Sequence, residues 1–223
     1  MKTTQGIFVT GTDTEVGKTF VSIALLDMLR RQGVRAAAMK PVASGAKKIN
    51  GKYLNDDALQ LQQAAGIDAL YAQVNPFVFP EAIAPHIAAA RMGVEIDFET
   101  IKQPFQSLSE QSDFILVEGV GGWLAPLNRQ QTVADLAIEI ELPVLLVVGL
   151  RLGCINHALL SAGAIEQSGA KLLGWIANKV QGNYPCVDEN IEAITQWLDA
   201  PLLATLDHLD NVATAGLDLR LEQ

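Results

Sequence analysis

A glycine-rich loop between a predicted strand and a predicted helix constrains this chain more than any other segment. Residues 7–10 form a short β-rich run that stops at Gly11, and residues 18–31 carry apolar side chains at helical spacing. The connecting residues 11–19 read Gly-Thr-Asp-Thr-Glu-Val-Gly-Lys-Thr and end in the Gly-Lys-Thr triplet of a phosphate-binding loop. The segment therefore predicts the strand, loop and helix that open a nucleotide-binding α/β fold.

The chemistry of this loop follows from its residue types. Backbone N–H groups wrap a phosphate, and the N-terminus of the helix adds a partial positive charge. Lys18 reaches the β and γ oxygens, and the Thr19 hydroxyl is suited to ligate Mg²⁺. The spacing departs from the common pattern, because Thr12 occupies the first glycine position and Gly11 stands one residue earlier. The alternative is an ordinary turn.

Near-continuous apolar strands alternate with helical stretches along the rest of the chain. This alternation predicts an α/β fold with a doubly wound, mostly parallel sheet and helices on both faces, built as a single domain over residues 1–223. Residues 69–110 are predicted to be mostly helical. The further strands are expected at 34–39, 114–117, 144–148, 172–177 and 202–206, and the further helices at 57–65, 133–140, 155–167 and 191–198.

The composition excludes several classes of protein. Sixteen Lys and Arg against 25 Asp and Glu give a net charge of −9, which offers no basic surface to nucleic acid or to anionic lipid. No membrane span and no secretory signal are expected, so the chain is predicted to be cytoplasmic. Cys154 and Cys186 show no metal-ligand spacing, and in the cytoplasm they are expected to stay free thiols rather than form a disulfide.

Acidic side chains that follow the strands suggest a metal site. Glu118 ends the apolar strand at 114–117, and Asp57 lies at a predicted helix start. Mg²⁺ prefers oxygen ligands beside nucleotide phosphates, which Thr19, Asp57 and Glu118 could supply together. The alternative for Asp57 is that its carboxylate only caps the helix.

Two further segments follow strands at the same predicted edge of the sheet. Glu118 opens Glu-Gly-Val-Gly-Gly, where Gly119, Val120 and Gly121 let the backbone approach a ligand, although a flexible turn is the alternative. Lys40 follows the strand at 34–39 and precedes Pro41. It would stabilise an anion in the same crevice as Lys18, or it would merely be solvated. We expect it to be solvated without ligand, so that its replacement hardly affects folding.

Asn178 ends the strand at 172–177 and is followed by Lys179. A carboxamide pairs with adenine by two hydrogen bonds. The run Asn-Lys-Val-Gln resembles the guanine reader of small GTPases but has Gln181 in place of the aspartate that guanine favours. The segment therefore predicts an adenine contact.

These motifs together resemble the dethiobiotin synthetase family, the ATP-dependent ligases of biotin biosynthesis. The resemblance covers most of the chain, and four segments in the same order are its most specific parts. They are residues 9–19, 40–45 (Lys-Pro-Val-Ala-Ser-Gly), 117–122 (Val-Glu-Gly-Val-Gly-Gly) and 153–157 (Gly-Cys-Ile-Asn-His).

The resemblance implies a homodimer that binds 7,8-diaminononanoate, CO₂ or bicarbonate, and ATP with Mg²⁺. One substrate amine takes up CO₂ to give a carbamate, ATP phosphorylates the carbamate, and the second amine closes the ring and expels phosphate. Such a reaction needs positioning and electrostatics rather than a covalent nucleophile.

The resemblance also assigns residues to roles. Lys18, Lys40 and Thr14 would be catalytic, and Ser44 would orient the substrate. Gly153, Cys154, Ile155 and Asn156 would meet the substrate carboxylate of the neighbouring subunit. ATP would be bound by Glu15, Val16, Gly17, Lys18, Thr19, Phe20, Asp57, Glu118, Gly119, Val120, Gly121, Asn178 and Lys179, with Thr19, Asp57 and Glu118 on the metal.

Three positions depart from the family pattern. Val120 stands where alanine is expected, residues 206–208 lack an expected proline beside the purine, and Asn190 occupies the ungapped position of a tyrosine. Two other classes are considered. A partitioning-type ATPase switch usually has a lysine where Asp13 stands, and an amidoligase needs a glutaminase domain for which 223 residues leave no room.

Overall fold

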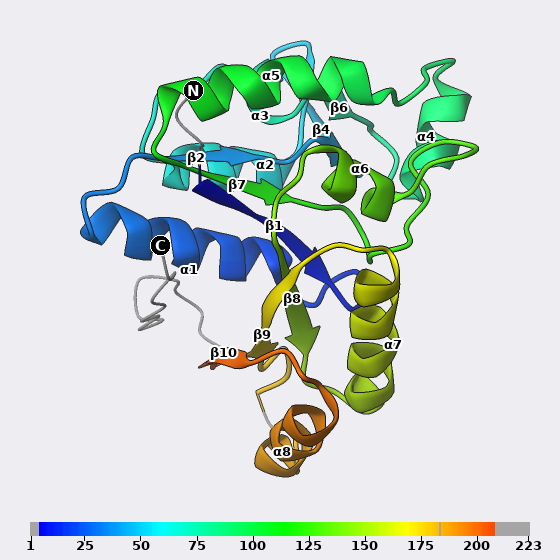
Figure 1. Ribbon diagram of the computed structural model, residues 1–223. Coiled ribbons are helices and arrows are strands. Elements are labelled where there is room, and N and C mark those ends of the chain that lie inside the picture. Colours follow the sequence, from blue (N-terminus) through cyan, green and yellow to red (C-terminus); the bar gives the residue numbers. More distant parts are fainter. Residues whose placement is uncertain (1–4, 183, 208–223) are drawn as a thin grey trace.

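The computed structural model describes residues 5–182 and 184–207, and a six-stranded sheet forms its centre (Figure 1). The strand order is β10-β9-β8-β1-β7-β2, and all neighbouring pairs are parallel. The predicted doubly wound parallel sheet is confirmed. In chain order the elements are β1 (Gln5–Gly11), α1 (Lys18–Arg31), β2 (Ala36–Met39), β3 (Val42–Ala43), β4 (Lys47–Ile49), β5 (Lys52–Leu54), α2 (Asp56–Ala64), α3 (Tyr71–Val74), β6 (Phe77–Val78), α4 (Pro85–Arg91), α5 (Phe98–Gln111), β7 (Phe114–Glu118), α6 (Val133–Glu139), β8 (Val144–Gly149), α7 (Cys154–Gln167), β9 (Leu172–Asn178), α8 (Val187–Trp197) and β10 (Leu202–Leu206).

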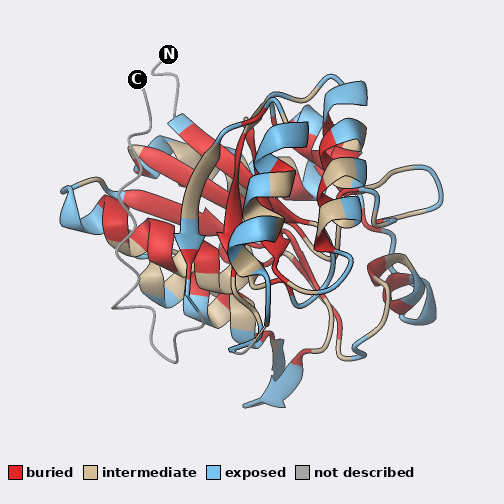
Figure 2. Ribbon diagram, turned by 90° about the horizontal axis from the view of Figure 1, so that it is seen from below, coloured by how far each residue is buried: buried red, intermediate tan, exposed pale blue. Residues whose placement is uncertain are grey.

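Helices cover both faces of the sheet, and each face has its own apolar core. On one face α1 and α2 pack against alternate strand residues such as Val9 and Leu116. On the other face α4 to α8 pack against the intervening residues, such as Phe8 and Val117. Figure 2 shows the strands as a buried layer between helices whose outer surfaces are exposed. Strands buried on both faces must be apolar throughout, which is why their sequences do not alternate.

The register of the sheet brings three chain segments to one place. Val117 of β7 is paired with Phe8 of β1 on one side and with Met39 of β2 on the other. The residues that follow these partners therefore emerge at the same edge, where the strands end. Since ligands of open α/β sheets bind beyond the carboxyl ends of the strands, this edge is where a site is expected.

The structure adds elements that the sequence pattern did not predict. An antiparallel hairpin of β4 and β5 and a short parallel pair of β3 and β6 lie outside the central sheet. Residues 69–110 contain α3, α4 and α5, as predicted, but also β6. The last helix begins at Val187 rather than at 191, because its first turn is polar and does not follow the apolar spacing. Residue 208 of the loop noted above lies outside the described residues. In the part of the chain that the structure describes, no helix is long and apolar enough to span a bilayer.

Candidate functional site

A cavity of about 770 Å³ lies beyond the ends of β1, β2 and β7. It collects many of the residues that the sequence singled out. These are Thr14, Glu15, Gly17, Lys18, Thr19, Lys40, Ser44, Asp57, Glu118, Val120 and Gly121. The remaining lining comes from Gly122 and from two segments without a recognisable motif, residues 82–85 and 125–126. The cavity therefore joins the phosphate-binding loop, the segment after β2 and the glycine loop after β7.

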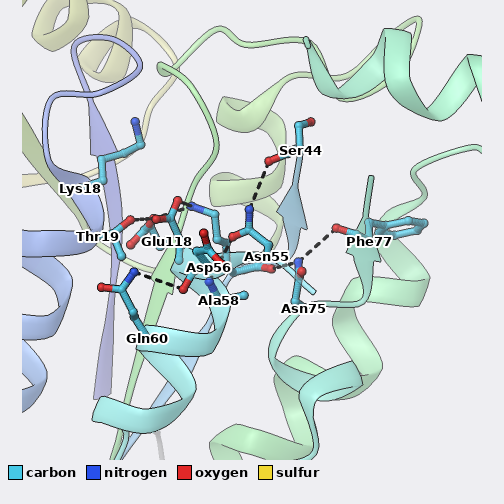
Figure 3. Close-up of polar contacts among 12 residues, drawn as sticks. Lys18, Thr19, Ser44, Asn55, Asp56, Ala58, Gln60, Asn75, Phe77 and Glu118 are labelled. Carbon is cyan, nitrogen blue, oxygen red and sulfur yellow. Dashed lines mark hydrogen bonds and ion pairs between the residues drawn. The ribbon is translucent and has the colours of Figure 1, made fainter. Parts of the chain in front are cut away.

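Glu118 is at the centre of the polar contacts in this cavity. Its side chain is fully buried, and Oε1 accepts hydrogen bonds from Thr19 Oγ1 at 2.8 Å and from Lys40 Nζ at 2.6 Å (Figure 3). Oε2 is also buried, but it has no hydrogen-bond partner among the described residues. A buried carboxylate oxygen without a partner is costly, so this atom is suited to a cation or to a donor supplied by a ligand.

Lys40 is not the solvated lysine that its position suggested. Only 4 % of the residue is exposed, and Nζ lies 2.6 Å from Glu118 Oε1 and 3.2 Å from Asp57 Oδ2. Burial by itself lowers the pKa of Lys40, but Glu118 and Asp57 outweigh it and raise the pKa above its usual value. The prediction that Lys40 is solvated is therefore wrong. We now expect its replacement to affect folding, because its removal leaves a buried carboxylate short of its partner.

Asp57 lies near the start of α2 but does not cap this helix. The cap of α2 is Asn55, whose side-chain oxygen accepts a hydrogen bond from the N–H of Ala58 at 3.1 Å. Asp57 lies in the first turn and turns its carboxylate toward Lys40. Of the two interpretations of Asp57, simple capping is thus excluded, and its carboxylate lines the cavity with Thr19 and Glu118.

Lys18 is the second buried lysine of the cavity. Its Nζ donates to the backbone carbonyl of Asp13 at 2.9 Å, within its own loop. Burial, followed by repulsion from Lys40, lowers the pKa of Lys18 to about 8. Two ammonium groups facing one cavity make that cavity a favourable place for an anion, and a bound phosphate would raise the pKa of Lys18 again.

The phosphate-binding loop is shaped by its backbone and by Asn178. Gly17 has φ of 86°, and a Cβ there would lie only 2.1 Å from Asn178 Nδ2, so this position requires glycine. Asn178 Nδ2 donates to the carbonyl of Val16 at 2.9 Å. The side chain of Val16 is buried in the core, and Phe20 packs against that core. Neither Val16 of the loop nor Phe20 of α1 lines the cavity.

A supporting layer of polar side chains had no recognisable signal in the sequence. Asn75 Nδ2 donates to the carbonyl of Lys40 at 2.7 Å, and Asn55 Nδ2 donates to the carbonyl of Ser44 at 3.2 Å (Figure 3). The Tyr71 hydroxyl connects the two asparagines, since it donates to Asn75 Oδ1 and accepts from the N–H of Asn55. These hydrogen bonds hold the backbone at both ends of residues 40–44.

Some predicted site residues lie apart from the cavity. Gly119 does not line it, and a Cβ at this position would press against Phe8 and Val133. The side chain of Lys179 forms an ion pair with Asp207 at 2.5 Å. The predicted carboxylate-binding residues begin at Gly153, with φ of 92°, at the start of α7, and none of Gly153, Cys154, Ile155 and Asn156 lines the cavity.

The parallel sheet and the Gly-Lys-Thr loop at the edge of the cavity define a nucleotide-binding protein of the P-loop NTPase class. Two solved structures share the fold. MinD complexed with Mg-ADP from Pyrococcus horikoshii OT3 has a TM-score of 0.55 at 20% identity, covering 92% of this chain and 82% of that one. The ParA family ATPase from Chlorobium tepidum TLS has a TM-score of 0.57 at 11% identity, covering 93% of this chain and 86% of that one. A family model described as an AAA domain matches residues 5–215, and the ATP-dependent dethiobiotin synthetase BioD of Aromatoleum aromaticum is 52% identical over 216 residues, or 96% of each chain. The chain belongs to the ATP-dependent dethiobiotin synthetase family, a family of ligases.

Proposed function

We propose that this chain, as one domain over residues 1–223, converts 7,8-diaminononanoate, CO₂ and ATP into dethiobiotin, ADP and phosphate. One amine adds to CO₂ and loses a proton, which gives a carbamate. A carbamate oxygen takes the γ-phosphoryl group of ATP and forms a carbamic-phosphoric anhydride. The second amine then attacks the carbonyl carbon, forms the second C–N bond of the ring and expels phosphate.

The observation that carries this proposal is the pair of buried lysines on one cavity. Lys18 lies on the phosphate-binding loop after β1, and Lys40 lines the same cavity from the end of β2, on the other side of β7. The carbamate and the phosphoryl group are both anions, and their charge must be balanced while the group is transferred. Fixed cations in a site of low polarity supply that balance without reorganisation.

Two hydroxyl groups of the cavity are candidates for orienting the substrate. Ser44 and Thr14 both line the cavity. Thr14 precedes Lys18 in the phosphate-binding loop, and Ser44 follows Lys40. Ser44 Oγ is buried without a hydrogen-bond partner within the described residues. A buried hydroxyl in this state favours a ligand group as its partner. We assign to Ser44 and Thr14 the alignment of the diamine, so that its amines approach the carbonyl carbon.

The same site is suited to Mg²⁺. Its oxygen donors are Thr19 Oγ1, the Asp57 carboxylate and the buried Oε2 of Glu118, which has no other partner in the described chain. Hard oxygen donors of this kind match the preference of Mg²⁺, which commonly takes one or two carboxylates together with phosphate oxygens. When bound, the ion would neutralise charge on the transferring phosphates.

The predicted homodimer and cytoplasmic location remain proposals. The loop before α7 exposes Leu152 to 90 %, and Leu160 on α7 is 65 % exposed. Large apolar side chains that are so exposed favour burial against another subunit. A second copy there would bring Gly153–Asn156 to the site of its neighbour, where the N–H groups at the start of α7 suit a carboxylate.

Product analysis tests the proposed reaction directly. The protein is mixed with MgATP, bicarbonate and 7,8-diaminononanoate, and the product is examined by mass spectrometry for one added carbonyl. We expect ring closure, and we expect phosphate release to depend on the diamine, because the carbamate is the phosphoryl acceptor. Phosphate release at the same rate without diamine would contradict the proposal and would favour a partitioning-type switch, although Asp13 stands where such switches usually have a lysine.

Asn178 offers a separate test of nucleotide selectivity. We expect the protein to prefer ATP over GTP. Replacing Asn178 by Asp should raise the dissociation constant of ATP about tenfold and that of GTP less, because a carboxylate cannot donate to adenine N7. The bond from Asn178 to the Val16 carbonyl is lost whichever nucleotide binds. Affinities for both nucleotides are measured in both proteins. If the two affinities fall by the same factor, Asn178 supports the loop and does not read the base.

A further inference from the structure

Asp13 places a carboxylate in a loop that is built to bind an anion. Its Oδ1 accepts the N–H of Thr14 at 2.7 Å, and its backbone carbonyl accepts Lys18 Nζ. Its Oδ2 lies 2.5 Å from Arg151 Nη2, in the loop that joins β8 to α7. These three contacts hold Asp13 in place beside Lys18, the side chain expected to bind phosphate.

The negative charge of Asp13 opposes the binding of a polyphosphate at the same loop. Lys18 does not cancel this charge by a direct ion pair, since it contacts the carbonyl of Asp13 rather than the carboxylate. Arg151 does form a direct ion pair with the Asp13 carboxylate, and this ion pair balances the charge. We infer that Arg151 is a positioning residue for nucleotide binding: it neutralises Asp13, so that the loop keeps the Asp13 turn without repelling the phosphates.

The fold presents Arg151 to the loop independently of any ligand. β8 is hydrogen-bonded to β1 with Gly11 opposite Val147, and the N–H of Leu150 is bonded to the carbonyl of Asn178. These contacts fix the backbone just before Arg151. Neither Asp13 nor Arg151 lines the cavity, so the pair acts on the loop rather than on the reacting atoms.

The ion pair of Arg151 and Asp13 is also partly exposed, so its effect on nucleotide binding can be measured apart from any effect on stability. The side chains of Arg151 and Asp13 are 31 % and 50 % exposed. Ion pairs with this much solvent contact contribute little to stability. Removing the ion pair should therefore leave the melting temperature nearly unchanged, while an unbalanced charge on the phosphate-binding loop still lowers the affinity for nucleotide.

Four variants test the inference: Arg151→Gln, Asp13→Asn, both together, and Arg151→Lys. The probe is the β,γ-methylene analogue of ATP with Mg²⁺, and its dissociation constant is measured by calorimetry at low and high salt. Arg151→Gln should weaken binding roughly three- to tenfold at low salt, and less at high salt. Asp13→Asn keeps an oxygen for the Thr14 N–H and should bind as tightly as the unchanged protein or more tightly.

The double variant decides between charge balance and a mechanical tether. If Arg151 balances charge, Asp13→Asn restores the affinity of Arg151→Gln to within about twofold, and Arg151→Lys retains it. A double variant as weak as Arg151→Gln, or an Arg151→Gln variant of normal affinity, would overturn the inference. The inference rests on the proposed use of ATP but not on the proposed product, so failure to form dethiobiotin leaves this test intact.

Discussion

Exchange of Lys40 for Gln should lower kcat by at least about 100-fold at saturating MgATP and diamine, the loss typical when a fixed group that stabilises transition-state charge is removed. The ammonium of Lys40 is held at the cavity by Glu118 and Asp57, so its position is set before substrate arrives. Affinity for ATP should fall less than kcat, because Lys18 and the loop amides still hold the phosphates. Steady-state kinetics and nucleotide titration measure the two effects.

The same substitution also lowers stability. Glu118 is fully buried and loses its partner at 2.6 Å, and breaking a buried ion pair costs about 3 kcal/mol. For a chain of this length that corresponds to a melting temperature lower by roughly 6 to 12 °C. Kinetics are therefore measured well below the melting temperature of the variant.

Two control variants separate chemistry from stability. Leu108→Ala removes a buried side chain from α5, which costs about 3 kcal/mol without changing the cavity. Lys102→Gln removes a lysine paired with Glu99 and Glu139 at the surface. Both should retain kcat within about twofold, as variants distant from the site do. A Lys40→Gln protein with near-normal kcat would show that Lys18 and the metal balance the charge alone.

The sequence predicted the sheet well, because its strands are continuous apolar runs and its first turn has a recognisable motif. Helix α1 was predicted at its observed bounds, and β10 likewise. The hairpin of β4 and β5 was not predicted. Three of its six strand residues are lysines and five are exposed, so they show no alternation of buried and exposed side chains that would indicate a strand.

The site was predictable as a set of positions but not as a set of contacts. Lys18 and Lys40 come after β1 and β2, Glu118 ends β7, and parallel strands end at one edge. Whether Lys40 is solvated or paired depends on Asp57 and Glu118, which are 17 and 78 positions away in the chain. The roles of Asn55, Tyr71 and Asn75 were not predictable for the same reason, since long-range polar contacts leave no local sequence pattern.

Exchange of Glu118 for Gln should be the second most damaging change, and it should alter a different quantity. The amide keeps one oxygen for Thr19 or Lys40, but it replaces the unpartnered Oε2 by a donor that cannot ligate a cation. We expect kcat to fall about 100-fold. We also expect the Mg²⁺ concentration for half-maximal rate to rise at least about tenfold. Lys40→Gln should leave that concentration within a factor of about three, because it removes no metal ligand.

Stability of the double variant provides an independent measurement of the same pair. Glu118→Gln alone leaves Lys40 with Asp57 as its one remaining carboxylate, so it should also lower the melting temperature. Combining Lys40→Gln with Glu118→Gln removes both buried charges and leaves two amides that can bond to each other. The double variant should therefore melt at a higher temperature than either single variant while remaining inactive. If it melts below both, the two side chains stabilise the fold separately rather than as an ion pair.

The Mg²⁺ requirement of Glu118→Gln has its own contradicting outcome. If this single variant keeps the normal Mg²⁺ requirement, the metal is held without Glu118.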